Sequence, residues 1–241
     1  MSDALRHHAI RESSHRILDP FTDEQLATLG RALHLRAGSS VLDLACGKGE
    51  LLCTWARDHG VVGTGVDLNP PFVEAARERA ASLGVDVEFV LADASGFVAP
   101  TPVDVASCVG ATWIGGGAVG TLALLERSLA PGGLALVGEP FWRAEPPEEA
   151  KEIGDFSTLP GLVSQVQEAG WDLVEMVLAD EASWDRYVAA QWLNLRRFLD
   201  EHPDDPLAPA FREELSTAPL HYVTYQRPFL GWGVLALAKR P

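Results

Sequence analysis

The sequence predicts an α/β protein built on a doubly wound, mostly parallel sheet. Short apolar segments bounded by turn residues, such as residues 41–45, are typical of strands that are buried on both faces of a sheet. Segments with helical periodicity separate these strands, and strands that alternate with helices form parallel sheets. The chain has 241 residues, of which 47% are hydrophobic and 22% charged, as in ordinary globular proteins. We therefore expect a single domain over residues 1–241.

The N-terminal 37 residues are expected to form a helical cap on this domain. Residues 4–19 have the pattern of a polar helix and include three histidines. Thr22 and Gln25 then match a capping box, the side-chain arrangement that begins many helices, and Gly38 ends the helix that follows.

Residues 38–181 are expected to form the core, with strands and helices in alternation. Asn69 and Pro70 favour the start of a helix, and Gly84 favours its end. The strands are expected at 41–45, 61–67, 85–91, 103–109, 134–139 and 171–178. The helices are expected at 49–58, 70–83, 121–129 and 158–169, and the acidic segment 145–149 is expected to be a surface loop.

Residues 182–226 interrupt the alternation before a last, seventh strand within residues 227–241. A long helix is expected at 183–200, with Trp184, Val188 and Trp192 on one side, followed by a proline-rich loop and a short helix at 210–215. The sheet needs only a short connection here, and the prolines allow the helices to fold back over the sheet. We expect this insertion to act as a helical lid.

Charge and cysteine content exclude several classes of function. The formal charge is −15, and a negative field repels phosphate backbones, so nucleic acid is not an expected partner. Three cysteines without a CxxC pair indicate reduced thiols, and the polar N-terminus lacks a secretory signal, so we expect a cytoplasmic protein. Residues 105–125 carry no charge but contain five glycines, which favour a loop and a helix over a membrane span, and no membrane partner is expected.

The strongest chemical signal is a strand, a glycine-containing turn and a helix at residues 41–50. Such a turn at the carboxyl end of a strand lets a ligand approach the backbone closely. Asp67 ends the next strand, where its carboxylate could accept hydrogen bonds from two ribose hydroxyls. Asp93 follows the third strand and could accept a bond from an adenine amino group. Together these positions predict a pocket for an adenosine.

The same residues favour one kind of adenosine ligand. A dinucleotide site requires a third glycine, and Leu52 occupies that position. The acidic side chain of Asp43 would repel a phosphate but suits a positively charged amino group. S-Adenosylmethionine, an adenosine that carries an amino acid and a sulfonium, fits both observations.

These segments resemble those of the Rossmann-like, class I S-adenosylmethionine-dependent methyltransferases. The resemblance is carried by VLDLACGKGE (41–50), GVDLN (65–69), LADAS (91–95), residues 104–110 and LAPGGLALVGEP (129–140). It implies S-adenosylmethionine as the cofactor and a sheet order of 3-2-1-4-5-7-6 with the last strand antiparallel. It also implies the cofactor-binding residues: Asp43 and Ala45 for the amino group, Gly47 and Gly49 for the approach of the methionyl part, Asp67 for the ribose, Leu68, Asp93 and Ala94 for adenine, and a backbone carbonyl at Val109. The family usually has glycine where this chain has Ala45.

The sequence gives a less specific signal for the residues around the acceptor. Residues 110–113 and 139–142 follow the fourth and fifth strands and are expected to line the site of a small-molecule acceptor. Trp113, Trp142 and Tyr187 are candidate contacts to the acceptor, or they pack in the core. His15, Glu139, His221 and Tyr222 are candidate bases, or they are ordinary surface and packing residues. No group of His, Cys, Asp or Glu has the spacing of metal ligands, so no metal is expected.

The sequence thus favours a methyltransferase that moves a methyl group to a small molecule by in-line displacement. A base is needed only if the attacking atom carries a proton. Two alternatives remain at this level: a protein that binds S-adenosylmethionine without catalysis, and a nicotinamide-dependent oxidoreductase.

Overall fold

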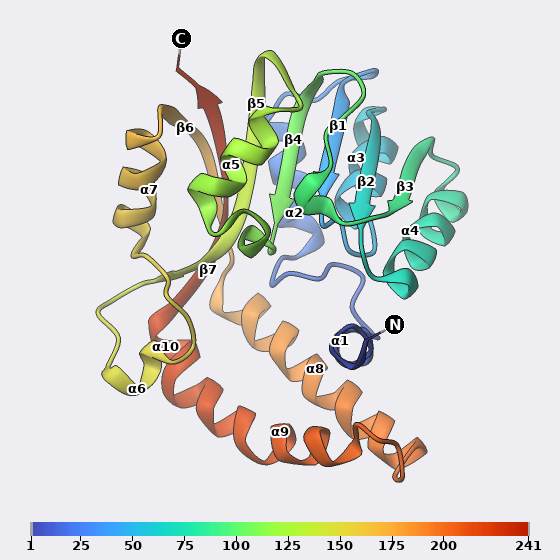
Figure 1. Cartoon of the computed structure of the whole chain (residues 1–241), viewed down its shortest axis with the longest axis vertical. Coiled ribbons are helices and arrows are strands. Elements are labelled where there is room, and N and C mark those ends of the chain that lie inside the picture. Colours follow the sequence, from blue (N-terminus) through green and yellow to red (C-terminus); the bar gives the residue numbers. More distant parts are fainter. Residues whose placement is uncertain (1, 241) are drawn as a thin grey trace.

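The computed structural model describes residues 2–240, which form a seven-stranded sheet flanked by helices (Figure 1). The strand order is β3-β2-β1-β4-β5-β7-β6, and β7 runs antiparallel to β5 and β6, so the predicted order and direction are confirmed. The strands are β1 (Ser40–Leu44), β2 (Val62–Asp67), β3 (Val87–Leu91), β4 (Val103–Val109), β5 (Leu129–Trp142), β6 (Trp171–Leu178) and β7 (Leu230–Lys239).

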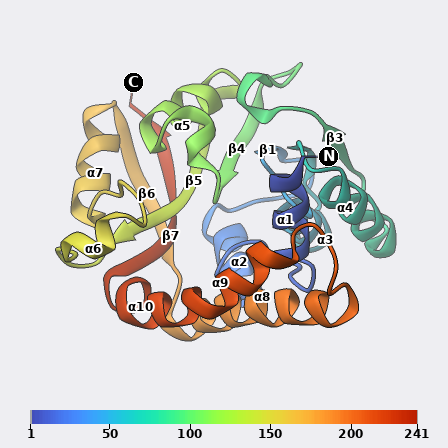
Figure 2. The same ribbon diagram turned by 60° about the horizontal axis from the view of Figure 1, so that its bottom comes forward.

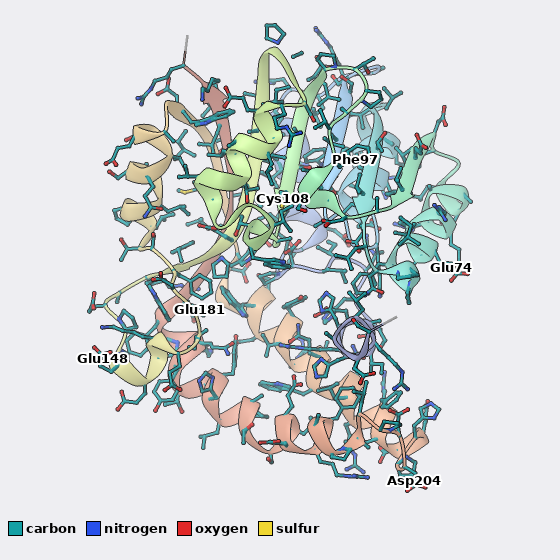
Figure 3. The ribbon with its side chains drawn as sticks, in the orientation of Figure 1. Glu74, Phe97, Cys108, Glu148, Glu181 and Asp204 are labelled. Atoms are coloured by element: carbon teal, nitrogen blue, oxygen red, sulfur yellow. The ribbon has the colours of Figure 1, made fainter. Side chains whose placement is uncertain are left out.

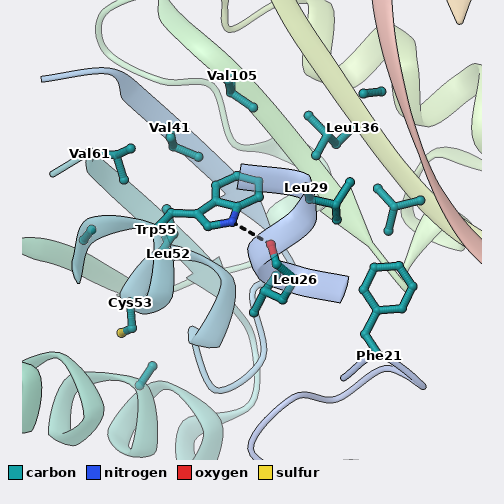
Figure 4. Close-up of a cluster of buried hydrophobic side chains, with 14 of the residues drawn as sticks. Phe21, Leu26, Leu29, Val41, Leu52, Cys53, Trp55, Val61, Val105 and Leu136 are labelled. Atoms are coloured by element: carbon teal, nitrogen blue, oxygen red, sulfur yellow. Dashed lines mark hydrogen bonds between the residues drawn. The ribbon is translucent and has the colours of Figure 1, made fainter. Parts of the chain in front are cut away.

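Helices cover both faces of the sheet. One face packs against α2 (Asp23–Ala32), α3 (Glu50–His59) and α4 (Pro70–Leu83). The other face packs against α5 (Ala118–Glu126) and α7 (Leu159–Glu168). The first cluster includes Trp55, whose indole N–H donates to the carbonyl of Leu26 at 3.2 Å and so ties α3 to α2 (Figure 4).

A third layer of helices lies below the carboxyl ends of the parallel strands (Figures 1 and 2). It consists of α1 (Asp3–Arg11), α8 (Glu181–Glu201) and α9 (Ala208–His221), and α8 contacts both α1 and α9. A π-helical turn (Tyr222–Gln226) and the short α10 (Arg227–Phe229) connect this layer to β7. None of the helices within residues 2–240 is long and apolar enough to cross a membrane.

The first helix is shorter than the sequence predicts. It ends at Arg11, whereas helical periodicity continues to residue 19. The ammonium of Lys48 donates to the carbonyls of Glu12, Ser13 and His15 at 2.7 to 3.1 Å, and these are acceptors that a continuing helix would use itself. We call residues 12–21, which run from α1 to α2, the strap.

Further boundaries differ from the prediction. The helix expected at 121–129 spans Ala118–Glu126, and Leu129 already begins the next strand. The helix expected at 210–215 spans Ala208–His221, because Pro209 lies in its first turn, where no backbone N–H is needed. The fifth strand begins at Leu129 and includes the Pro131-Gly132-Gly133 segment as an irregularity in its pairing with β4. Part of the expected surface loop at 145–149 belongs to a one-turn helix, α6 (Glu148–Lys151), and two 3-10 turns occur at Ala94–Gly96 and Thr112–Gly115.

Candidate functional site

A cavity lies where the carboxyl ends of β1, β2 and β4 meet, and we call it the first cavity. Five of the residues expected to contact the cofactor line it: Asp43, Ala45, Gly47, Asp67 and Val109. They come from three different strands and the turn after β1. The parallel arrangement therefore brings together residues that are up to 66 positions apart in the sequence.

The turn after β1 has an unusual backbone. Ala45 and Gly47 have left-handed φ angles of 57° and 55°. This conformation costs a residue with a side chain about 1 kcal/mol or more, so Ala45 carries a strain that glycine would not. Gly49 has a φ of 69° and precedes α3, and a methyl group on it would collide with the ring of Phe89. The absence of a side chain at Gly49 thus serves packing inside the domain, and Gly49 does not line the first cavity.

Asp43 is a nearly fully buried carboxylate at the base of the first cavity. The hydroxyl of Ser107 donates to its Oδ1 at 2.7 Å. Burial raises the pKa of Asp43 to about 7, and the nearby Asp67 adds to the rise while the Ser107 bond lowers it. A carboxylate that is this poorly solvated is stabilised by a cationic ligand group.

Asp67 is oriented by two backbone amides. The N–H of Gly47 donates to Oδ2 at 2.9 Å, and the N–H of Asn69 donates to Oδ1 at 2.8 Å. Each oxygen keeps a second lone pair for a ligand. Burial raises the pKa of Asp67, and the two amide bonds counteract the rise. The side chain of Asn69 does not cap α4, although the residue occupies the capping position; its amide donates to the carbonyl of Leu5 instead.

Three of the predicted adenine contacts lie outside the first cavity. Leu68 is 49% exposed, and Asp93 is exposed and caps the 3-10 turn that contains Ala94. They remain close to Asp67, because its carbonyl accepts a hydrogen bond from the N–H of Ala92 at 3.0 Å. They therefore occupy the rim at the ends of β2 and β3.

The strap closes the first cavity from the side of the third helical layer. Its Ile17, Leu18 and Asp19 line the cavity, and the side chain of Leu18 occupies the space beside Gly47. Lys48 holds the strap through the three carbonyl groups described above. Arg16 of the strap pairs with the buried Glu50 at the start of α3. The turn that lines the first cavity therefore also binds the strap.

A buried polar network attaches the strap to α8. Its centre is Glu12, which is 1% exposed. Oε1 of Glu12 accepts from the amide of Gln191 at 2.7 Å and lies 3.1 Å from the hydroxyl oxygen of Tyr187, and Oε2 lies 2.7 Å from Nδ1 of His15. Burial raises the pKa of Glu12, but the contact with His15, followed by the charge of His8 and the Tyr187 hydroxyl, together outweigh it and leave the pKa below its usual value. His15, a candidate base in the sequence, faces this network and lines neither the first cavity nor the second cavity described next.

A second cavity of about 800 Å³ adjoins the first, between the ends of β4 and β5 and helix α8. It is lined by three of the candidate residues for acceptor binding or catalysis: Glu139, Trp113 and Tyr187. The two cavities share Leu18, Asp19, Gly110, Trp113 and Tyr187. In Figure 3, the labelled Cys108 marks the carboxyl end of β4, and Glu181 marks the start of α8.

The other three candidates do not line either cavity. Trp142 is 6% exposed and packs edge-on against Phe156. The hydroxyl of Tyr222 donates to Asp185 at 2.9 Å, and His221 stacks near Tyr225 at the end of α9. These contacts are those of packing and surface residues.

Several lining residues carried no signal in the sequence. They include His8, Leu18, Asp19, Phe72, Gln165, Gln191 and Trp232. Each comes from an element whose local pattern is that of an ordinary helix, loop or strand. Within residues 2–240, no group of three or more His, Cys, Asp or Glu side chains could hold a metal ion.

Comparison with known proteins places the chain in a well-populated family. Residues 41–133 match a family model described as a methyltransferase domain. The uncharacterized protein YjhP of Escherichia coli (strain K12) is 52% identical over 99% of this chain and 100% of its own length.

Two solved structures are similar over 98% of both chains. One is a SAM-dependent methyltransferase from Thiobacillus denitrificans in complex with S-adenosyl-L-homocysteine, at 55% identity and a TM-score of 0.94. The other is a SAM-dependent methyltransferase from Geobacter sulfurreducens in complex with the same ligand, at 52% identity and a TM-score of 0.95.

Proposed function

Because the chain belongs to the Rossmann-like, class I S-adenosylmethionine-dependent methyltransferases, whose cofactor is S-adenosylmethionine, we propose that it transfers a methyl group from this cofactor to a small molecule. The observation that carries the proposal is the wall shared by the two cavities. Asp19, Gly110 and Trp113 border both of them, so an acceptor in the second cavity faces the ligand in the first.

The residues of the first cavity fit the cofactor. Asp43 and the carbonyl of Ala45 would hold the cationic amino group, because burial makes the Asp43 carboxylate favour a nearby positive charge. Asp67 would take the two ribose hydroxyls with the lone pairs that its two amide bonds leave free. Leu68 and Asp93, on the rim, would contact the adenine.

When bound, S-adenosylmethionine supplies a methyl group that is electrophilic because it is attached to a sulfonium. The chain's own residues then have to align the acceptor and keep water out. The strap and α8 would do this together, since Tyr187 of α8 donates to the carbonyl of Leu18 at 2.9 Å and both residues line both cavities.

The covered second cavity supports an acceptor of small size. Its volume of about 800 Å³ falls in the range of small-molecule sites. Helices α1, α8 and α9 extend across the carboxyl ends of the strands (Figure 2), which would hinder the approach of a large folded substrate.

Two measurements in sequence test the proposal. Isothermal calorimetry of the full chain should detect S-adenosylhomocysteine binding and weaker or no binding of NADH. The protein is then incubated with S-adenosylmethionine and a panel of small amines, phenols, thiols and carboxylic acids. Mass spectrometry should detect the release of S-adenosylhomocysteine. Asp67→Ala serves as the binding-deficient control. Binding without product from any member of the panel would favour the non-catalytic alternative, and preferential NADH binding would favour the oxidoreductase.

A further inference from the structure

The second cavity is lined by three carboxylates that have no ion-pair partner within residues 2–240: Asp19, Glu139 and Asp155. Arg11 is the one basic side chain among the described residues that line this cavity. Its Nε lies 3.6 Å from Glu214, and its guanidinium donates to Gln191 at 2.7 Å. The charge of Arg11 is thus already opposed, and the acidic side chains that line the cavity outnumber this one basic side chain.

Two of the carboxylates stand beside the shared wall. The carboxylate of Asp19 contacts Gly110, at the carboxyl end of β4. Glu139 follows Gly138, whose carbonyl accepts the N–H of Gly110 at 2.8 Å. Asp19 and Glu139 therefore flank the same strand end, and Asp19 borders both cavities.

Aromatic side chains form much of the remaining wall. Trp113, Phe156, Trp184, Tyr187 and Trp232 line the second cavity, and Trp113 is 74% exposed. The faces of aromatic rings attract organic cations, and carboxylates add a direct charge interaction. Unpaired carboxylates and aromatic faces around one cavity are the chemistry that binds an organic ammonium group.

We infer that the acceptor is an organic amine, which the second cavity binds as an ammonium ion through Asp19, Glu139 and the aromatic wall. The inference rests on the proposed function and specifies its acceptor. The carboxylates would also offset the repulsion between the ammonium and the nearby sulfonium.

The same arrangement provides a route for the proton. The bound ammonium gives one proton to the carboxylate of Asp19, which frees the lone pair of the nitrogen. That lone pair forms the bond to the methyl carbon while the carbon–sulfur bond breaks and its electron pair stays on sulfur. The product is a methylated ammonium ion, and the protonated Asp19 returns its proton to solvent. Burial raises the pKa of Asp19, and the charges of Asp43 and Glu12 raise it further, so its carboxylate is suited to accept a proton.

The test uses the full chain loaded with S-adenosylhomocysteine and a pair of probes. Choline carries a quaternary ammonium, and 3,3-dimethylbutan-1-ol has nearly the same shape without the charge. Calorimetry should find choline at least tenfold tighter than the neutral alcohol. Asp19→Asn and Glu139→Gln should each weaken choline binding about tenfold and leave binding of the alcohol unchanged.

Asp155→Asn is a third variant if either of these fails to fold, as checked by circular dichroism. Glu88→Gln, which removes an exposed charge on β3, should have no effect.

The outcomes separate this inference from the proposed function. Failure of the wild-type chain to bind S-adenosylhomocysteine would defeat the proposed function itself. Normal cofactor binding with equal affinity for the two probes, or with no detectable choline binding, would overturn the amine inference alone. If Asp19→Asn weakens S-adenosylmethionine relative to S-adenosylhomocysteine but leaves choline unchanged, Asp19 serves the sulfonium, and the inference is also overturned. Turnover of phenols or carboxylic acids but not amines would have the same consequence.

Discussion

Replacing Asp43 by Asn should make the cofactor-free protein more stable at neutral and alkaline pH. Burial raises the pKa of Asp43 from 3.8 to about 7 in the folded state. Between these values the folded chain keeps a proton that the unfolded chain has lost, so the folded state binds more protons and the stability of the wild-type protein falls as pH rises. Each pKa unit corresponds to about 1.4 kcal/mol, so the shift of about three units should cost the wild-type protein about 4 kcal/mol as the pH rises from roughly 4 to 8, and the variant should keep this stability.

Urea unfolding, followed by tryptophan fluorescence at a series of pH values without cofactor, measures this difference. The Asn side chain can still accept the Ser107 hydrogen bond, so the fold should survive. Asp86→Asn, at an exposed position, is the matched control and should follow the wild-type curve. The Asp43 variant should also lose most of its affinity for S-adenosylhomocysteine, since the anion opposite the amino group is gone. Parallel stability curves for the wild-type protein and Asp43→Asn would refute the reasoning.

Three other substitutions test other parts of the site. Asp67→Ala should weaken S-adenosylhomocysteine at least tenfold in calorimetry, because each hydrogen bond to a charged group contributes about 1.5 to 3 kcal/mol; unchanged affinity would move the ribose site elsewhere. Lys48→Met removes three hydrogen bonds to the strap, so it should weaken S-adenosylhomocysteine binding about tenfold and speed tryptic cleavage after Arg16. The control Lys151→Met should change neither quantity. Equal cleavage rates in Lys48→Met and the wild-type protein would mean that other contacts hold the strap. Gly49→Ala places a methyl group against the ring of Phe89 at a position where the backbone has a left-handed φ. It should lower the free energy of unfolding, measured in urea, by about 2 kcal/mol or more. An unchanged free energy of unfolding would contradict this packing role.

The grouping of residues in the first cavity could be predicted because the information for it is local. Asp43 and Asp67 end apolar strands, and the turn that follows the first strand has its glycines within a few residues. Parallel pairing of the strands then brings their carboxyl ends together, and no further sequence signal is needed. The packing role of Gly49 is not local, since the ring of Phe89 on β3 fills the space beside it.

The strap could not be predicted, because distant residues decide its conformation. Residues 12–19 have helical periodicity, and the group that ends the helix is Lys48, which lies in the glycine turn. Two partners of Glu12, Tyr187 and Gln191, are on α8, about 180 residues later, and a buried Gln191 in a helix looks like an exposed one in the sequence. The same contacts show that segment 182–226 is not separable from the cofactor half: Tyr187 lines both cavities.

The contacts between α1 and the rest of the third helical layer also constrain how the protein is made. Arg6 pairs with Asp205, His7 with Glu214, and Arg11 donates to Gln191, so residues near the start of the chain bind residues 180 to 207 positions later. During synthesis the sheet strands β1 to β5 emerge well before these partners. The first cavity, which Tyr187 of α8 and Val234 of β7 help to line, therefore stays incomplete on the ribosome until these elements have been made. A chain that stops short of α8 would pair only the five strands β3-β2-β1-β4-β5, because β6 joins the sheet through β7, and it would leave the pocket uncovered.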